Sequence, residues 1–186
     1  MKKTGLIAVI ALLVITAIFM IGGYNGIVTK QETVESSLAN LDVMLQRRAD
    51  LIPNLVNTVK GYTSHESDVI NKITTARTKL VNANGVEEKS NANNELTNSL
   101  NALMVVVENY PDLKASQNFI ALSDELAGTE NRIAVARKDY NDAVKELNTT
   151  IKKFPNNLLA SMFGFEQAVY FEADDKSTEV PNVSFE

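Results

Sequence analysis

The chain has 186 residues, a formal net charge of -5 and a pI near 5.0, so it has room for one membrane segment and one domain of ordinary size. Nucleic acid is not an expected partner, because the lysines and arginines are scattered among acids and form no basic footprint. The absence of cysteine excludes disulfides, thiolate metal sites, cysteine nucleophiles and a lipid-modified N-terminal cysteine.

The N-terminal segment predicts a transmembrane helix. Lys2 and Lys3 precede an uncharged apolar run over residues 5–23, which is about the length that crosses the hydrocarbon core of a bilayer. A cleaved signal peptide is the alternative, but the run exceeds the usual secretory length and ends without an Ala-x-Ala-like site. We therefore expect a cytoplasmic N-terminus over residues 1–4 and a transmembrane signal anchor over residues 5–24.

Residues 34–62 predict a long helix that continues directly out of the membrane. Its seam residues recur at alternating steps of four and three, the a/d spacing of a helix with one packed face. Pro53 predicts a local kink or a restart, and Gly61 predicts the end of the helix. The seam consists of Val34, Leu38, Leu41, Leu45, Arg48, Ile52, Leu55, Val59 and Tyr62.

Two shorter helices are predicted next. A capping box at residues 63–66 predicts the start of the second helix, and the Asn and Gly residues of the segment 82–85 predict the turn before the third. The sequence Tyr110-Pro111-Asp112 interrupts the third helix. The apolar stripes of the two helices consist of Val69, Ile73, Ala76 and Leu80, and of Ala92, Leu96, Leu103 and Val107.

A fourth helix is predicted up to Pro155, and its buried face consists of Phe119, Leu122, Leu126, Ile133, Ala136, Tyr140, Ala143, Leu147 and Ile151. Four amphipathic helices joined by short turns favour an antiparallel four-helix bundle over residues 25–155. Residues 156–186 predict a short helix over the apolar stretch 158–165 and an extended tail that ends in the alternating Val183-Ser184-Phe185. The expected fold class is therefore all-α.

Several motifs along the chain resemble the signature of a known family. The longest is Arg47-Arg48-Ala49-Asp50-Leu51-Ile52-Pro53-Asn54-Leu55-Val56, followed by Val59-Lys60-Gly61-Tyr62 and His65-Glu66. The others are Tyr24-Asn25, Tyr110-Pro111-Asp112-Leu113-Lys114-Ala115 with Phe119, Glu130-Asn131-Arg132-Ile133-Ala134 with Arg137, Tyr140-Asn141 and Phe154-Pro155. Over nearly the whole chain these motifs resemble the LemA family. The resemblance implies a single-pass membrane protein with a helical-bundle domain, and it implies no particular biochemical activity.

Residue types that catalysis needs are scarce in this chain. It has one histidine, no cysteine, and no Gly-x-Ser-x-Gly, Walker or Rossmann glycine pattern. His65-Glu66 resembles the start of a zinc-protease motif, but Val69 occupies the position of its second histidine. Paired carboxylates for glycoside cleavage remain an alternative, although pairs such as Glu87-Glu88 and Asp174-Asp175 are expected on solvated faces. We expect no enzyme activity, no cofactor and no metal.

Arg48 falls on the apolar seam, where a guanidinium group needs a partner. One interpretation is a structural bridge to an acid on a facing helix, for which the candidates are Glu108, Asp124, Glu125 and Glu130. The other interpretation is a polar patch that binds a partner. The candidate interaction or buried polar cluster consists of Arg47, Arg48, Asp50, Asn54, Glu130 and Arg137.

These patterns favour a non-catalytic interaction or scaffold module of the bacterial cell envelope. Its expected location is the inner (cytoplasmic) membrane, with the C-terminal domain periplasmic or extracellular, and its expected partner is another envelope protein. Self-association is a further possibility, because long a/d seams also pair with copies of themselves. The alternative function is a binding module with a small-molecule or peptide pocket between the helices, near Tyr110, Phe119 and Tyr140.

Overall fold

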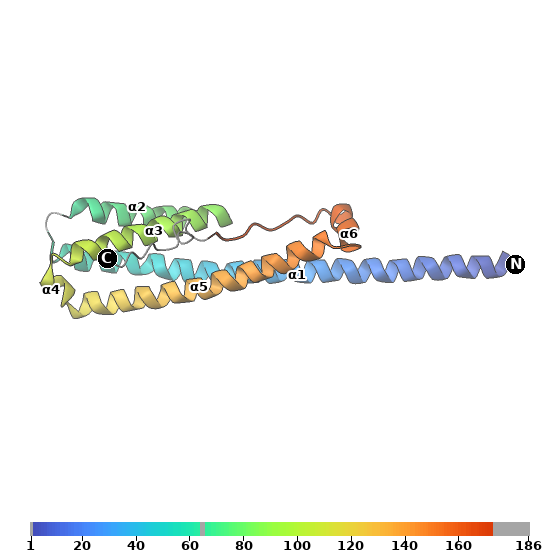
Figure 1. The fold of residues 1–186 in the computed structure, drawn as a ribbon, viewed down its shortest axis with the longest axis horizontal. Coiled ribbons are helices and arrows are strands. Elements are labelled where there is room, and N and C mark those ends of the chain that lie inside the picture. Colours follow the sequence, from blue (N-terminus) through green and yellow to red (C-terminus); the bar gives the residue numbers. More distant parts are fainter. Residues whose placement is uncertain (1, 64–65, 173–186) are drawn as a thin grey trace, which may run out of the picture. The chain divides into compact units, whose positions relative to one another are not determined.

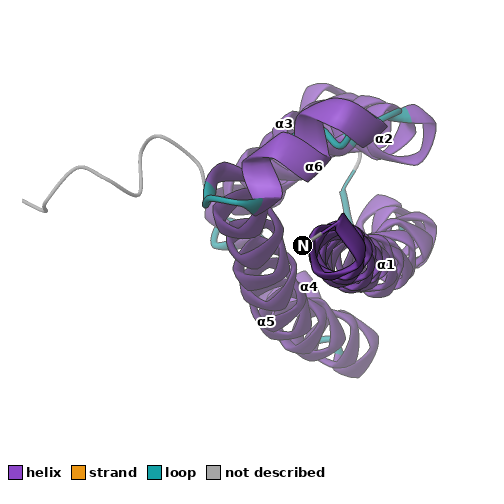
Figure 2. Cartoon of the chain, turned by 90° about the vertical axis from the view of Figure 1, so that its right-hand side faces the viewer, coloured by secondary structure: helices purple, strands orange, loops and turns teal. Residues whose placement is uncertain are grey.

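The computed structural model describes residues 2–63 and 66–172, and every regular element within this part is an α-helix (Figures 1 and 2). The predicted all-α class is therefore confirmed. The helices are α1 (Lys2–Lys60), α2 (Ser67–Asn82), α3 (Val86–Val107), α4 (Pro111–Lys114), α5 (Gln117–Lys152) and α6 (Asn156–Phe163). His65, Asp174-Asp175 and Val183-Ser184-Phe185, which the sequence analysis singled out, lie outside the described residues.

The chain divides into two compact units, and α1 and α5 each contribute residues to both of them. The first unit contains the chain up to Leu38 together with Asp139–Ala168. The second contains Ala39–Lys138 together with the described residues from Val169 onward. The buried polar residues of the predicted cluster belong to the second unit, whereas the apolar start of α1 belongs to the first.

α1 is a single helix from the predicted anchor to Lys60, and Pro53 lies inside it without restarting it. Its first part carries exposed apolar side chains from Leu6 to Ile21. By length and composition, this is the one helix among the described residues that can cross a membrane. The sequence pattern and the structure therefore agree on a long helix that begins with an apolar span.

In the second unit the core forms where the helices turn their apolar stripes toward one another. The predicted seam of α1 is buried from Leu41 to Val59, including Arg48, and Ala49 and Val56 widen it because a helix in a globular core buries a broader face than a strict a/d seam. Tyr62 is an incorrect seam prediction. It follows the end of the helix and is exposed, since α1 stops at Lys60.

α2 and α3 form an antiparallel pair of helices within the second unit, as Figure 1 shows. The predicted capping box is incorrect, because α2 begins at Ser67 and the Thr63 hydroxyl donates to the carbonyl of Val59 at 3.1 Å. Ile73, Ala76 and Leu80 are buried as predicted, whereas Ile70 takes the place of Val69, which is only half-buried. The interruption predicted at Tyr110-Pro111-Asp112 is present, with Pro111 at the start of α4.

The first unit packs α6 and the segment after it against α1 and the end of α5. Leu159 and Ala160 of α6 are buried, as are Ile27 of α1 and Val144 of α5. The buried amide of Asn148 on α5 holds the following segment by two hydrogen bonds to Ala168, one to its carbonyl at 2.8 Å and one from its N–H at 2.9 Å. These two bonds satisfy the backbone carbonyl and N–H of Ala168, which have no helix or sheet partner in an irregular segment.

Candidate functional site

Arg48 is the most deeply buried charged group among the described residues, with only 4 % of its side chain exposed. Its Nη1 lies 2.7 Å from Glu130 Oε2 on α5 and donates to Asn93 Oδ1 at 2.6 Å and Thr97 Oγ1 at 3.0 Å on α3. Three helices of the second unit therefore converge on one guanidinium group. Of the four acids proposed as partners from the sequence, Glu130 is the one that faces it.

Burial lowers the pKa of Arg48 from its usual value, and the negative charge of Glu130 opposes that effect. Arginine stays protonated despite such a shift, because its usual pKa lies far above neutral pH. The Glu130 side chain is 41 % exposed, although its Oε2 atom, which faces Arg48, is buried. The Arg48 guanidinium is therefore a fixed positive charge that links helices, and it exchanges no proton near neutral pH.

The other predicted cluster residues lie around this centre without joining it. Arg47 forms an ion pair with Glu125, and it is half-exposed. Asp50 is exposed and accepts a hydrogen bond from Gln46 at 2.8 Å, and Asn54 is exposed on the next turn of α1. Arg137 is half-buried on α5, two turns beyond Glu130. The structure thus brings together Arg48 and Glu130 and leaves Arg47, Asp50 and Asn54 on the surface.

Sequence analysis missed the contribution of α3 to this site. Ser90 and Asn93 are buried and Thr97 is half-buried, at steps of three and four along the helix. That spacing places the three on one face, which is the signal that could have identified them. These three residues form a polar stripe with the same period as the apolar stripe of α3.

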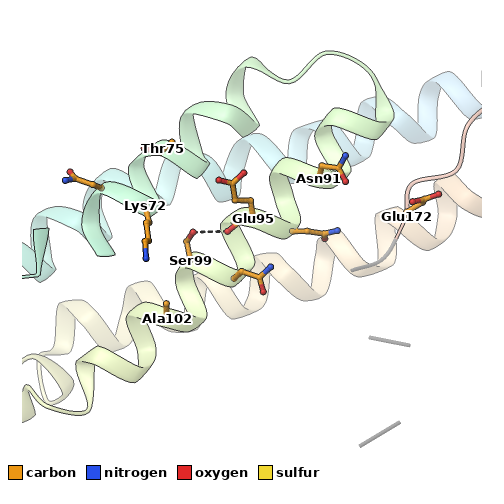
Figure 3. Close-up of a pocket in the computed structure, with 10 residues that line it drawn as sticks. Lys72, Thr75, Asn91, Glu95, Ser99, Ala102 and Glu172 are labelled. Carbon is orange, nitrogen blue, oxygen red and sulfur yellow. Dashed lines mark hydrogen bonds between the residues drawn. The ribbon is translucent and has the colours of Figure 1, made fainter. Parts of the chain in front are cut away.

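A groove of about 800 Å³ runs between α2 and α3 (Figure 3). Apart from Ala102 its lining residues are polar, and Figure 3 shows Lys72, Glu95 and Ser99 on the two helices and Glu172 on the segment after α6. They are Asn71, Lys72 and Thr75 of α2, Asn91, Asn94, Glu95, Asn98, Ser99 and Ala102 of α3, and Glu172. The Ser90 hydroxyl donates to the carbonyl of Glu172 at 2.8 Å, which attaches the segment after α6 to one end of the groove.

The groove offers many hydrogen-bonding groups. Each asparagine amide presents two donors and an acceptor, which matches a peptide backbone or a polyol. The carboxylate of Glu95 in its wall is held by Lys79 at 2.7 Å, and the Ser99 hydroxyl donates to the Glu95 carbonyl at 2.9 Å. In the described part of the chain, no three acidic or histidine side chains gather as metal ligands would.

The aromatic residues around which a pocket was predicted do not line this groove. The Tyr110 hydroxyl donates to Glu66 Oε1 at 2.8 Å, and this hydrogen bond raises the pKa of Tyr110. Phe119 is buried in the second unit, whereas Tyr140 is buried in the first, where burial raises its pKa. The pocket around these three side chains stays a prediction.

Comparisons with known proteins place the chain in a family. The LemA family model matches residues 37–185. Among curated proteins, the chain is 30% identical to Magnetosome protein MamQ 2 of Paramagnetospirillum magneticum, with 80% of this chain and 64% of that protein covered. It is 27% identical to Magnetosome protein MamQ of Magnetospirillum gryphiswaldense over the same shares, and 26% identical to Protein LemA of Metamycoplasma hominis, with 83% and 71% covered.

The chain spans 64% of the length of the magnetosome relatives that it matches. The family match includes α2, α3, α4, α5 and α6, and it begins within α1 beyond the apolar span. Both the buried Arg48 centre and the groove between α2 and α3 therefore fall within the matched residues. On this match, the chain belongs to the LemA family.

Proposed function

We propose that the chain is a single-pass protein of the cytoplasmic membrane whose remaining helices form an antiparallel bundle and act as a non-catalytic interaction module of the bacterial cell envelope. The apolar start of α1 supports the anchor. Lys2 and Lys3 before the span support a cytoplasmic N-terminus, with the bundle periplasmic or extracellular. Family membership and the all-helical fold fit a membrane-associated helical protein.

The observation that carries the interaction role is the polar groove between α2 and α3. Asn91, Asn94 and Asn98 follow one another at steps of three and four, so their amides form a row on one side of α3. At ~1.5 Å of rise per residue this row extends roughly 10 Å, the length of about three residues of extended chain. We infer that the groove binds an extended segment of an envelope protein through main-chain hydrogen bonds.

A small polar molecule is the second candidate occupant. The groove volume of about 800 Å³ lies within the range of small-molecule sites, which supports this reading. Most of its lining residues are of polar types, however, and none is aromatic, whereas small-molecule pockets are usually lined by apolar and aromatic side chains. Peptide binding therefore remains the preferred proposal.

Site-specific crosslinking tests the interaction role in intact membranes. A photo-reactive amino acid replaces Asn94 in the full-length chain, and the control carries it at Val135, an exposed residue of α5 in the same unit. We expect an adduct with another protein from position 94 and none from position 135. Adducts that join two differently tagged copies of this chain indicate self-association, and equal yields at both positions contradict the groove.

The anchor is tested separately by extraction and by labelling. Because the chain has no cysteine, a single Glu88→Cys substitution provides one reactive thiol on an exposed turn of α3. We expect the full-length protein to resist alkaline extraction and the introduced thiol to react with an impermeant maleimide from outside intact spheroplasts. Release by alkali, or labelling only after the membrane is permeabilised, contradicts the anchor or its orientation.

A further inference from the structure

α6 has an apolar surface that nothing in the described part of the first unit covers. Leu159 and Ala160 are buried, but Leu158, Met162 and Phe163 on the same short helix are exposed, as is Phe154 just before it. Met162 is 64 % exposed and Phe154 is 80 % exposed. Four large apolar side chains gathered within ten residues are costly to leave in water, so this surface requires an occupant.

α6 packs beside the last two turns of the apolar span of α1. A Cβ atom added at Gly23 would overlap Leu159 Cδ1, so glycine at this position allows α6 to approach α1 closely. The ring of Tyr24 meets the ring of Phe163 edge to face, with centroids 5.0 Å apart. Phe163 also lines an apolar pocket of about 370 Å³ together with Ala17, Met20, Ile21 and Tyr24.

Two further contacts keep α6 in this place. Gly164 adopts φ +76°, and the amide of Phe165 donates to the carbonyl of Ala160 at 3.0 Å, so the chain reverses directly after α6. Phe165 thereby returns to Tyr24, at a ring separation of 5.5 Å. The Asn148 amide holds Ala168 a few residues later. The exposed side chains therefore cannot be hidden by a simple rotation of α6.

We propose that α6 is a second membrane-contacting element, which lies in the lipid interface of the same bilayer that the start of α1 crosses. This inference rests on the proposed anchor. A helix needs about 20 residues to cross the hydrocarbon core, so a span that starts after Lys3 ends near Gly23. Because α6 packs against Gly23 and Tyr24, its exposed side chains lie at the depth of the outer interface.

The chemistry of this surface fits a phospholipid bilayer. Tyr24, Phe163 and Phe165 form an aromatic group at the end of the span, where aromatic belts occur in membrane proteins. Lys152 and Lys153 are exposed directly before Phe154, where they can meet phosphate groups. Lipid is preferred to a protein partner because the surface is continuous with a span that already faces lipid.

Spin labels on single cysteines test this placement without background, because the chain has no cysteine of its own. The full-length protein carries one label at Leu158→Cys, Met162→Cys, Leu13→Cys or Val135→Cys and is reconstituted into vesicles of equal parts phosphatidylethanolamine and phosphatidylglycerol. Leu13 reports the span. Val135 is the matched control, since it is apolar and 61 % exposed on α5, close to the value of Met162.

We expect the labels at residues 158, 162 and 13 to collide preferentially with oxygen, which concentrates in lipid. The label at residue 135 should collide preferentially with a water-soluble nickel chelate. If positions 158 and 162 behave like position 135 while position 13 remains in lipid, the interfacial placement of α6 is wrong and the anchor stands. If position 13 is also aqueous, the anchor is wrong. Labels at 158 and 162 that are shielded from both reagents indicate protein contact and overturn the lipid assignment.

Discussion

The Arg77 Nε on α2 donates a hydrogen bond of 2.8 Å to the carbonyl oxygen of Ala49 on α1. In a regular helix this carbonyl would accept from the amide of residue 53, but residue 53 is proline and has no N–H. Arg77 therefore provides the donor that Pro53 lacks. This replacement explains how α1 continues through Pro53, where the sequence alone predicted a kink or a restart.

Substitution of Arg77 should destabilise the protein only while Pro53 is present. Arg77→Leu leaves the buried carbonyl of Ala49 without a donor, which should cost about 1–2 kcal/mol of unfolding free energy. In a Pro53→Ala background the new amide at residue 53 pairs with Ala49, so the same substitution should cost less. Urea unfolding of the full-length protein in detergent, followed by circular dichroism, measures both values. Equal costs in the two backgrounds would contradict the proposed role of Arg77.

Loss of Glu130 should destabilise the protein more than loss of its ion-pair partner Arg48. Glu130→Leu leaves the guanidinium of Arg48 buried without a counter-charge, which should cost about 2–4 kcal/mol. Arg48→Met leaves Glu130, whose side chain is 41 % exposed and can turn toward water, so its cost should be smaller, about 1–3 kcal/mol. Thermal unfolding of both variants checks the order. A stable Arg48→Met variant that no longer gives the groove crosslink would show that this residue acts in binding and not in the fold.

Alkaline pH should remove the contribution of Tyr110 to stability. The hydrogen bond to Glu66 raises the pKa of Tyr110 above its usual value of 10.0, since the ionised phenolate can no longer donate to the carboxylate. The contribution is therefore fully present below the unfolded-state pKa and is lost as the pH rises through the higher folded-state pKa. The difference in unfolding free energy between wild type and Tyr110→Phe should be constant near neutral pH and shrink above about pH 10. A difference that does not change with pH would exclude this hydrogen bond as its source.

Asn148 should hold the segment after α6 in place. Asn148→Leu removes both hydrogen bonds to Ala168, which should cost about 1–3 kcal/mol and expose residues 165–168 to protease. The matched control is Asn157→Leu, because Asn157 is exposed on α6. Limited proteolysis with mass spectrometry locates the new cleavage sites. Cleavage elsewhere, or the same cleavage in the control, would argue against this role.

Gly23 and Gly22 provide a matched pair for the contact between α1 and α6. A Cβ at Gly23 overlaps Leu159, whereas a Cβ at Gly22 has no atom within 4 Å. Gly23→Val should therefore displace α6 and expose Phe163 to protease in reconstituted vesicles, at a cost of about 1–3 kcal/mol. Gly22→Val adds the same apolar volume to the span without this effect, and Leu159→Ala should partly rescue Gly23→Val. Equal protease sensitivity of the two valine variants would contradict the close approach.

Local patterns in the sequence predicted the helices and most of their buried faces. The buried residues of α1 from Leu41 to Val59 follow directly from their spacing, because a helix with one apolar face packs on that face wherever it lies. The apolar start of α1 is equally visible, since its length and composition do not depend on any contact. Buried Arg48 was identified in the same way, as a charged residue on an apolar seam.

Tertiary structure alone decided which distant residues meet. Four acids could have faced Arg48, and the way that α5 packs in the second unit selects Glu130. The donor that replaces the missing N–H of Pro53 comes from Arg77, which lies 28 residues beyond Ala49 in the chain. The same holds for Phe163 against Tyr24, because helical periodicity states which face is apolar but not which partner covers it.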